Sequence, residues 1–135
     1  MKNPILGIIG GGQLGSLLSV AANRIGIKTV ILSDDENAPA KNFTEKFIYG
    51  KYDNKSITQE FIDSVDLVTY EFENIPFNIL QSINNEKTVL PKPEINNLIQ
   101  NRLTEKNFLN DINIQTTQYI STVSYTHLRA HETSR

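Results

Sequence analysis

The feature that most restricts how this chain can fold is a glycine turn between two apolar segments. Residues 5–9 form an apolar run of strand length, and residues 13–25 follow with leucines at helical spacing. Between them, Gly10, Gly12 and Gly15 fit the pattern G-x-G-x-x-G. In a strand–turn–helix context, this pattern is typical of a turn that approaches a ligand closely, because glycine has no Cβ. The free N–H groups that begin the helix would favour an anion.

The rest of the chain alternates between strand and helix patterns. Further strands are expected at 28–32, 47–49, 66–70 and 88–90, a short helical turn at 38–40, and helices at 56–64 (with Ser56 as N-cap), 76–83, 94–100 and 102–111. This alternation predicts an α/β fold, a Rossmann-like doubly wound parallel sheet of about five strands in the order 3-2-1-4-5. In that order, the glycine turn and residues 71–74 face each other across one cleft beyond the carboxyl ends of the first and fourth strands.

Composition limits the class of protein and of partner. The chain has 135 residues, about one domain, with 39% hydrophobic and 21% charged residues. A net charge of −2 without a basic block argues against nucleic acid or an anionic membrane as a partner. There is no cysteine, and we see neither a signal peptide nor an apolar stretch long enough for a membrane span. We therefore expect a cytoplasmic protein.

The glycine turn leaves two interpretations open. Asp34 and Asp35 follow the second strand about 20 residues past Gly15, where a ribose-binding acid of an NAD or FAD site would lie. Alternatively, the glycines only permit close packing of strand against helix. Gln13 weakens the dinucleotide interpretation, because its amide would point into the cleft and could hydrogen-bond a small polar ligand.

Two acids follow the fourth strand. Glu71 and Glu73 are two residues apart on an extended chain, so both side chains could enter the cleft. A carboxylate there could accept a hydrogen bond from an amine or a ribose hydroxyl. Either acid could instead cap the helix that begins near Pro76, a role that suits Glu73 or Asn74 better than Glu71.

Charged residues and histidines in the last third of the chain can be explained without a binding site. Arg102 and Lys106 are four apart on an expected helix, and pairing with Glu105 or solvation is the usual fate of such charges. His127 and His131 lack a third ligand, so we expect no metal site.

The segment 120–135 has no clear apolar period. We therefore expect it to be a non-native or disordered tail and leave it out of the fold.

Four motifs occur in an order that resembles a known family: Gly-Gly-Gly-Gln-Leu-Gly at 10–15, Thr-Tyr-Glu-Phe-Glu-Asn-Ile-Pro at 69–76, Pro-Lys-Pro at 91–93 and Asn-Arg-Leu-Thr-Glu-Lys-Asn-Phe-Leu at 101–109. Together they resemble the amino-terminal domain of the N5-carboxyaminoimidazole ribonucleotide synthase family of the ATP-grasp superfamily. The resemblance covers about residues 5–119 and implies a pre-ATP-grasp domain over 1–119, with the ATP-grasp domain missing. It further implies a ligase of purine biosynthesis that carboxylates 5-aminoimidazole ribonucleotide with ATP and bicarbonate.

The resemblance also assigns roles to individual residues. It places Arg102 towards ATP and the following residues beside the ribonucleotide: Gly12, Gln13, Leu14, Glu71 and Glu73. ATP and Mg²⁺ would be bound mainly by the missing domain, without NAD, and the full enzyme would form a homodimer. Ser16 stands where the family commonly has Arg. We expect no activity from this piece alone; the alternatives are an NAD- or FAD-binding module and an inert fragment that exposes an apolar face.

Overall fold

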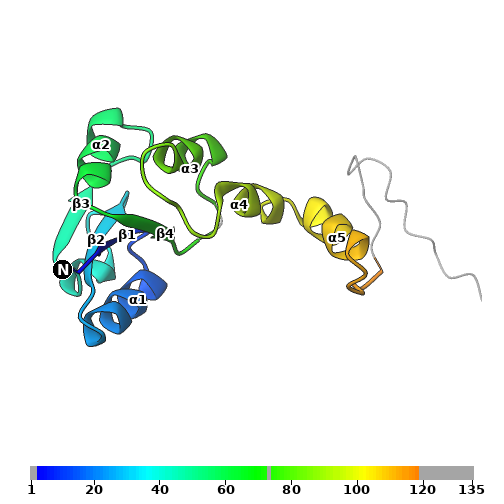
Figure 1. Ribbon diagram of the computed structural model, residues 1–135, viewed down its shortest axis with the longest axis horizontal. Helices are drawn as coiled ribbons and strands as arrows, with labels where there is room; N and C mark the ends of the chain where they lie inside the picture. The colour runs from blue at the N-terminus through cyan, green and yellow to red at the C-terminus, as the bar shows by residue number, and fades with distance from the viewer. Residues whose placement is uncertain (1–2, 73, 119–135) are drawn as a thin grey trace, which may run out of the picture. The chain divides into compact units, whose positions relative to one another are not determined.

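A computed structural model describes residues 3–72 and 74–118 of the chain. These residues divide into two compact units, one ending at Gln100 and the other beginning at Asn101. The first unit is built on a parallel sheet with the strand order β3-β2-β1-β4 (Figure 1). Its strands are β1 (Ile5–Ile9), β2 (Lys28–Ser33), β3 (Lys46–Tyr49) and β4 (Leu67–Tyr70). The predicted α/β class and the order of the first four strands are thus confirmed.

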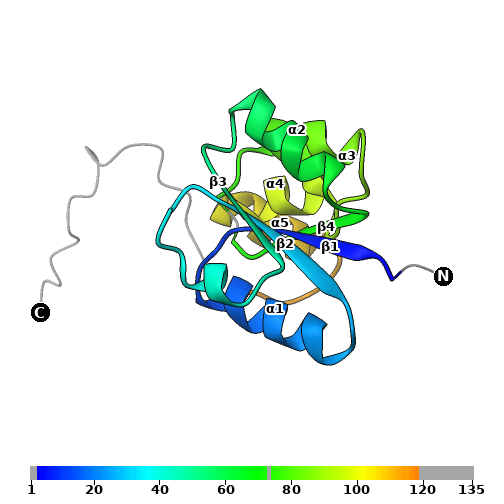
Figure 2. The same cartoon turned by 90° about the vertical axis from the view of Figure 1, so that its left-hand side faces the viewer.

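Helices cover both faces of this sheet. Figure 2 shows α1 on one face and α2 with α3 on the other. The helical elements are α1 (Gln13–Arg24), the 3₁₀ turn η1 (Pro39–Asn42), α2 (Lys55–Asp63), α3 (Phe77–Asn84), α4 (Pro93–Ile99) and, in the second unit, α5 (Arg102–Asp111). No helix among the described residues is long and apolar enough to cross a membrane.

The two faces of the sheet carry separate cores because side chains alternate along a strand. On one face, Ile9 and Leu32 pack with Phe61 of α2 and Leu80 of α3, all fully buried. On the other face, Ile8 and Ile31 pack with Ala40 of η1; the first two of these residues are paired across β1 and β2. The strands are therefore buried on both sides, as the continuous apolar runs of the sequence predict for a parallel sheet.

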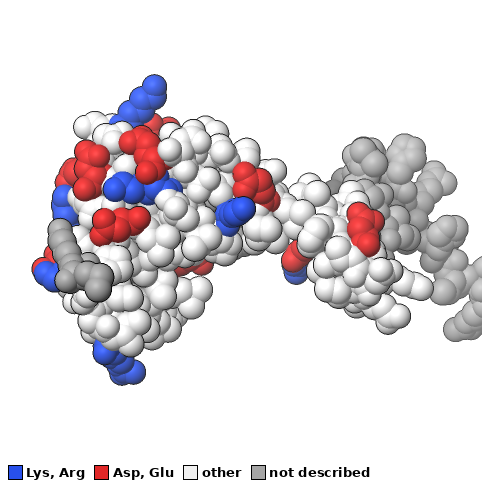
Figure 3. All heavy atoms as spheres, viewed as in Figure 1, with Lys and Arg blue, Asp and Glu red and all other residues white. Residues whose placement is uncertain are grey.

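Helix α1 packs on the sheet through small residues, not through its leucines. Its buried residues are Gly15, Ser16, Ser19 and Ala22. The expected helix is confirmed, and its leucines face solvent; Leu17, for example, is 59% exposed. Small side chains on the inner face let the backbone of the helix approach the sheet closely, chiefly at β2. Figure 3 shows acidic and basic side chains interspersed around α2 and a largely uncharged surface over α1.

The expected fifth strand is not present among the described residues. Val89 makes a single parallel bridge to Val68 of β4, at the sheet position where the fifth strand was predicted. Two backbone hydrogen bonds accompany this bridge, one from Val68 N–H to Thr88 and one from Leu90 N–H to Val68, each 2.9 Å long. The ladder stops there because Pro91 has no N–H to donate.

Helix α2 begins one residue before its predicted start and has a different cap. Asn54, not Ser56, is the N-cap, and its side-chain oxygen accepts hydrogen bonds from the N–H groups of Ser56 (3.1 Å) and Ile57 (3.3 Å). The prediction of Ser56 as the cap is wrong because both residues are good caps, and the sequence does not indicate which of them leaves the helical conformation.

Candidate functional site

The glycine turn and the end of β4 meet through one carboxylate. Gly12 N–H donates a hydrogen bond to Oε1 of Glu71 at 2.7 Å, and Gly15 N–H donates to Oε2 of the same side chain. Helix α1 has no cap from its own N-cap residue, Gly12. Glu71 therefore caps α1 from a neighbouring strand, where a negative charge is stabilised by the helix dipole.

The register of the sheet places the side chain of Glu71 on the face that α1 covers. Parallel pairing sets Thr69 beside Ile8, whose side chain lies in the core on the α1 face. Two residues further along an extended chain, Glu71 points to the same face. Its own N–H donates to the carbonyl of Ile9 at 3.1 Å, so the backbone at the end of β4 is anchored directly beside the turn.

The three glycines of the motif are explained by this carboxylate. A Cβ added to Gly10 would collide with Cγ of Glu71, and one added to Gly12 would lie 2.8 Å from its Oε1. A Cβ added to Gly15 would lie 2.6 Å from the carbonyl oxygen of Gly10 and 3.2 Å from Oε2 of Glu71. The G-x-G-x-x-G pattern thus makes room for a side chain of the protein itself as well as for close packing of helix on strand.

A tyrosine that the sequence reasoning missed lies at the same edge of the sheet. The hydroxyl of Tyr52, in the loop after β3, donates a hydrogen bond to Oδ1 of Asp34 at 3.2 Å, and its ring lies 6.2 Å from that of Phe72. Burial, followed by the charge of Asp34 and a smaller contribution from Glu71, raises the pKa of Tyr52 above its usual range. The available signal was topological, because this loop follows the carboxyl end of a strand.

Gln13 and Leu14 begin α1 immediately after Gly12, and both side chains are exposed. Gln13 lines an apolar hollow of about 390 Å³ between α1 and the η1 region, together with Pro39 and Phe43. Glu71 thus contacts the backbone of the turn that carries Gln13 and Leu14, whereas the hollow beside Gln13 is lined by residues of α1 and the η1 region.

The other predicted acids are placed differently. Glu73 lies outside the described residues. Helix α3 has Pro76 as its N-cap, which makes no side-chain hydrogen bond to the helix. Oδ1 of Asp35 accepts a hydrogen bond from the N–H of Asn37 at 2.9 Å and so stabilises the turn after β2.

In the second unit, Arg102 forms the pair that its spacing predicts. Its Nη1 lies 2.8 Å from Oε2 of Glu105, and 83% of the arginine side chain is exposed. Nζ of Lys106 donates to Oγ1 of Thr117 at 3.2 Å. Both histidines lie outside the described residues.

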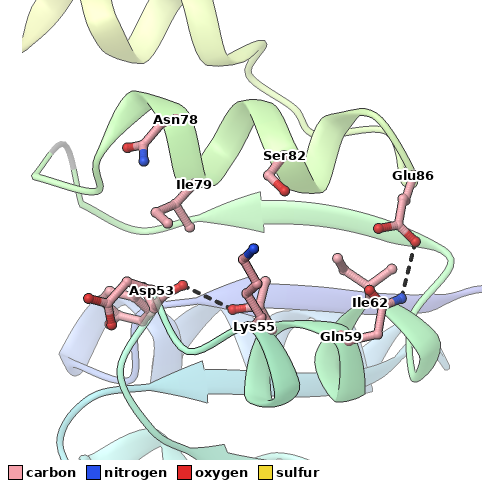
Figure 4. A pocket seen from close by; sticks show the side chains of 10 residues that line it. Asp53, Lys55, Gln59, Ile62, Asn78, Ile79, Ser82 and Glu86 are labelled. Atoms are coloured by element: carbon pink, nitrogen blue, oxygen red, sulfur yellow. Dashed lines mark hydrogen bonds between the residues drawn. The ribbon is translucent and has the colours of Figure 1, made fainter.

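A second hollow, of about 490 Å³, lies between α2 and α3 on the opposite face of the sheet (Figure 4). Lys55 and Gln59 of α2 face Asn78 and Ser82 of α3 across it. Nε2 of Gln59 donates to Oε2 of Glu86 at 3.1 Å and closes one end. These polar side chains belong to the outer surfaces of two helices, and none of the residues predicted from the motifs lies among them.

Over residues 3–72 and 74–118, no three metal-ligating side chains come together in a group that could hold an ion.

Comparisons with known proteins show which family the chain resembles in sequence. A family model described as the ribonucleotide synthetase preATP-grasp domain matches residues 1–100. An N5-carboxyaminoimidazole ribonucleotide synthase from Brucella melitensis is 40% identical over 111 residues, which are 82% of this chain and 31% of that protein. The chain therefore spans about a third of the length of such relatives.

Solved structures extend the similarity to the fold. An N5-carboxyaminoimidazole synthetase from Staphylococcus aureus complexed with ADP aligns with a TM-score of 0.78 at 34% identity, over 84% of this chain and 31% of that one. A synthase from Aspergillus clavatus in complex with ADP and 5-aminoimidazole ribonucleotide aligns with a TM-score of 0.73 at 28% identity, over 82% and 30%.

Proposed function

The chain belongs to the family of ribonucleotide synthetase preATP-grasp domains, and on this premise we propose that it is the amino-terminal part of an N5-carboxyaminoimidazole ribonucleotide synthase. The relatives that support this proposal are about three times as long as the matched segment. The parent protein would be a cytoplasmic ATP-dependent C–N ligase of purine biosynthesis. It would join bicarbonate to the exocyclic amine of 5-aminoimidazole ribonucleotide, and ATP would be cleaved to ADP and phosphate.

The observation that carries the proposal is the position of Glu71 against the glycine turn. Each oxygen of its carboxylate accepts one backbone N–H and keeps a further lone pair. These lone pairs could accept from an amine or a ribose hydroxyl of the ribonucleotide. We assign Gly12, Gln13 and Leu14 to the same wall of the site, where the amide of Gln13 would add hydrogen-bonding groups. Glu73 is assigned to this wall by its place in the sequence motif alone.

The nucleotide would be held mainly by the remainder of the parent protein. Arg102, at the start of α5, is our candidate for a contact with ATP, for which its pair with Glu105 would have to open. That pair is mostly exposed to solvent on the arginine side, so opening it would cost little. Mg²⁺, when bound with ATP, would offset phosphate charge during the transfer. The parent would act as a homodimer.

One observation favours a second possibility, that this piece by itself is an inert fragment. Leu14 and Leu17 on α1 are 62% and 59% exposed, and contiguous exposed apolar side chains often mark a contact with another protein surface. In either case, we expect no ATP-dependent release of phosphate from the 135-residue chain. Release that is stimulated by the ribonucleotide would contradict this expectation.

A domain exchange tests the proposal. Residues 1–100, which the family model matches, would replace the corresponding segment of the Staphylococcus aureus synthetase. We expect the chimera to release phosphate from ATP only when 5-aminoimidazole ribonucleotide is present. In the chimera, Gln13→Ala should raise the KM for the ribonucleotide. Gln59→Ala, which removes the same amide from the opposite face of the sheet, should leave it unchanged.

A folded chimera without ribonucleotide-dependent activity would count against the assignment. If both glutamine substitutions changed the KM for the ribonucleotide equally, Gln13 would not be a binding residue, although the proposed family function would still stand.

A further inference from the structure

The glycine turn already holds an anion that belongs to the protein. In turns that bind dinucleotides, the pyrophosphate lies at the helix N-terminus and accepts the free N–H groups there. Here the N–H groups of Gly12 and Gly15 donate to the two oxygens of Glu71. The carboxylate is half-buried, and its backbone is anchored to β1 through the carbonyl of Ile9.

We propose that Glu71 is a specificity-determining residue that occupies the phosphate position of the turn and excludes phosphate-bearing ligands, dinucleotides above all, from it. Two physical effects act together. The carboxylate fills the space: Oε1 lies 2.7 Å from the nitrogen of Gly12, in the position that a phosphate oxygen would have to take. Its negative charge also repels a second anion, at a short distance and partly away from water.

The acid that a dinucleotide would contact is also engaged within the protein. An acid at the end of the second strand would hydrogen-bond the ribose in such proteins. Oδ1 of Asp34, which holds that place in the sequence, instead accepts the hydroxyl of Tyr52 at 3.2 Å. Asp35, next to it, is engaged with the backbone of Asn37. The protein's own groups thus occupy the anion position of the turn and engage one oxygen of the acid that the sequence motif suggests for a ribose.

Exclusion of phosphate from the turn does not depend on ribonucleotide binding. It concerns only the N–H groups of Gly12 and Gly15, whereas a ribonucleotide could bind through the outer lone pairs of Glu71 with its phosphate elsewhere. An experiment can therefore contradict phosphate exclusion without contradicting ribonucleotide binding, and the reverse.

The test uses the 135-residue chain and two probes, inorganic pyrophosphate and NADH. Amide chemical shifts in two-dimensional NMR would be followed during titration of the wild type, Glu71→Ala and Glu71→Gln. Asp66→Asn is the matched control, because Oδ2 of Asp66 accepts the N–H of Ile5 at 2.8 Å, at the opposite end of β1. NADH fluorescence provides a second readout.

We expect no saturable shift at Gly12 or Gly15 in the wild type or in the Asp66→Asn variant. In the Glu71→Ala variant, pyrophosphate should bind at least about tenfold more tightly, since one nearby charge and its volume are gone. The Glu71→Gln variant, which keeps the shape but not the charge, should show a smaller gain. Saturable shifts at both glycines in the wild type would overturn the proposal without any variant. Folded Glu71 variants that bind pyrophosphate no better than the wild type would overturn it as well.

Discussion

The substitution Gly15→Ala tests whether helix propensity or tertiary packing decides the stability of the protein at the start of α1. Judged by helix propensity alone, replacing a glycine within a helix by alanine should stabilise the protein by about 1 kcal/mol. The tertiary structure predicts the opposite sign. The new Cβ would lie 2.6 Å from the carbonyl oxygen of Gly10 and 3.2 Å from Oε2 of Glu71. The first of these neighbours is backbone and cannot rotate away.

The magnitude follows from these two contacts. The Cβ would be roughly 1 Å too close to the carbonyl oxygen, and such overpacking costs about 1–3 kcal/mol. Moving α1 outward to relieve it stretches the hydrogen bond from Gly15 N–H to Glu71, and a hydrogen bond to a charged group contributes about 1.5–3 kcal/mol. After subtraction of the propensity gain of about 1 kcal/mol, we expect a net loss of about 1.5–5 kcal/mol. For a domain of about 100 residues, that loss lowers Tm by at least about 6 °C.

Urea and thermal unfolding followed by circular dichroism would measure this loss. Ala21→Gly, at an exposed position of the same helix, is the control and should cost about 1 kcal/mol through propensity alone. In a Glu71→Ala background, the cost of Gly15→Ala should shrink, because the hydrogen bond is already absent. An unchanged or raised Tm for Gly15→Ala would refute the packing of α1 on the turn that is described above.

Three further predictions concern other parts of the first unit. Because burial, with Asp34, raises the pKa of Tyr52, the native state holds that proton more tightly than the unfolded state. The resulting stability is complete below about pH 10 and declines as pH rises towards the native pKa, so Tyr52→Phe should lessen this alkaline loss in urea unfolding. Leu80→Ala should cost about 2–5 kcal/mol, because Leu80 is fully buried, whereas Leu17→Ala should change the free energy of unfolding by less than about 0.5 kcal/mol. Asn54→Ala should cost about 1 kcal/mol by removing the cap of α2, and circular dichroism would record the fall in Tm.

Much of the fold could be predicted because it depends on short-range patterns. Apolar runs bounded by glycine, proline and polar residues locate the four strands, and the alternation with helices predicts their parallel order. The errors occur where neighbouring residues compete or where a pattern is cut short. Asn54 and Ser56 are both good caps, and Thr88–Leu90 has strand composition but is followed by a proline that ends the ladder.

The proximity of Glu71 to the glycine turn could be predicted, but the hydrogen bonds between them could not. The sequence placed the glycine turn and Glu71 on one edge, because both follow strands that are adjacent in the sheet. It did not indicate that the carboxylate would take the two N–H groups of the turn itself. Nor did it bring Tyr52 to Asp34, since that contact joins loops that follow two different strands.

By itself, the sequence determined which segments become strands and helices, that glycine is needed at three places in the first turn, and which family the chain resembles. Only the tertiary structure decided what those glycines make room for. Residues 12 and 71 are 59 positions apart, and the pairing of β4 with β1 brings them within hydrogen-bonding distance. The physical reason is that periodicity and turn chemistry act over a few residues, whereas the partner of a polar group is chosen by the packing of the whole sheet.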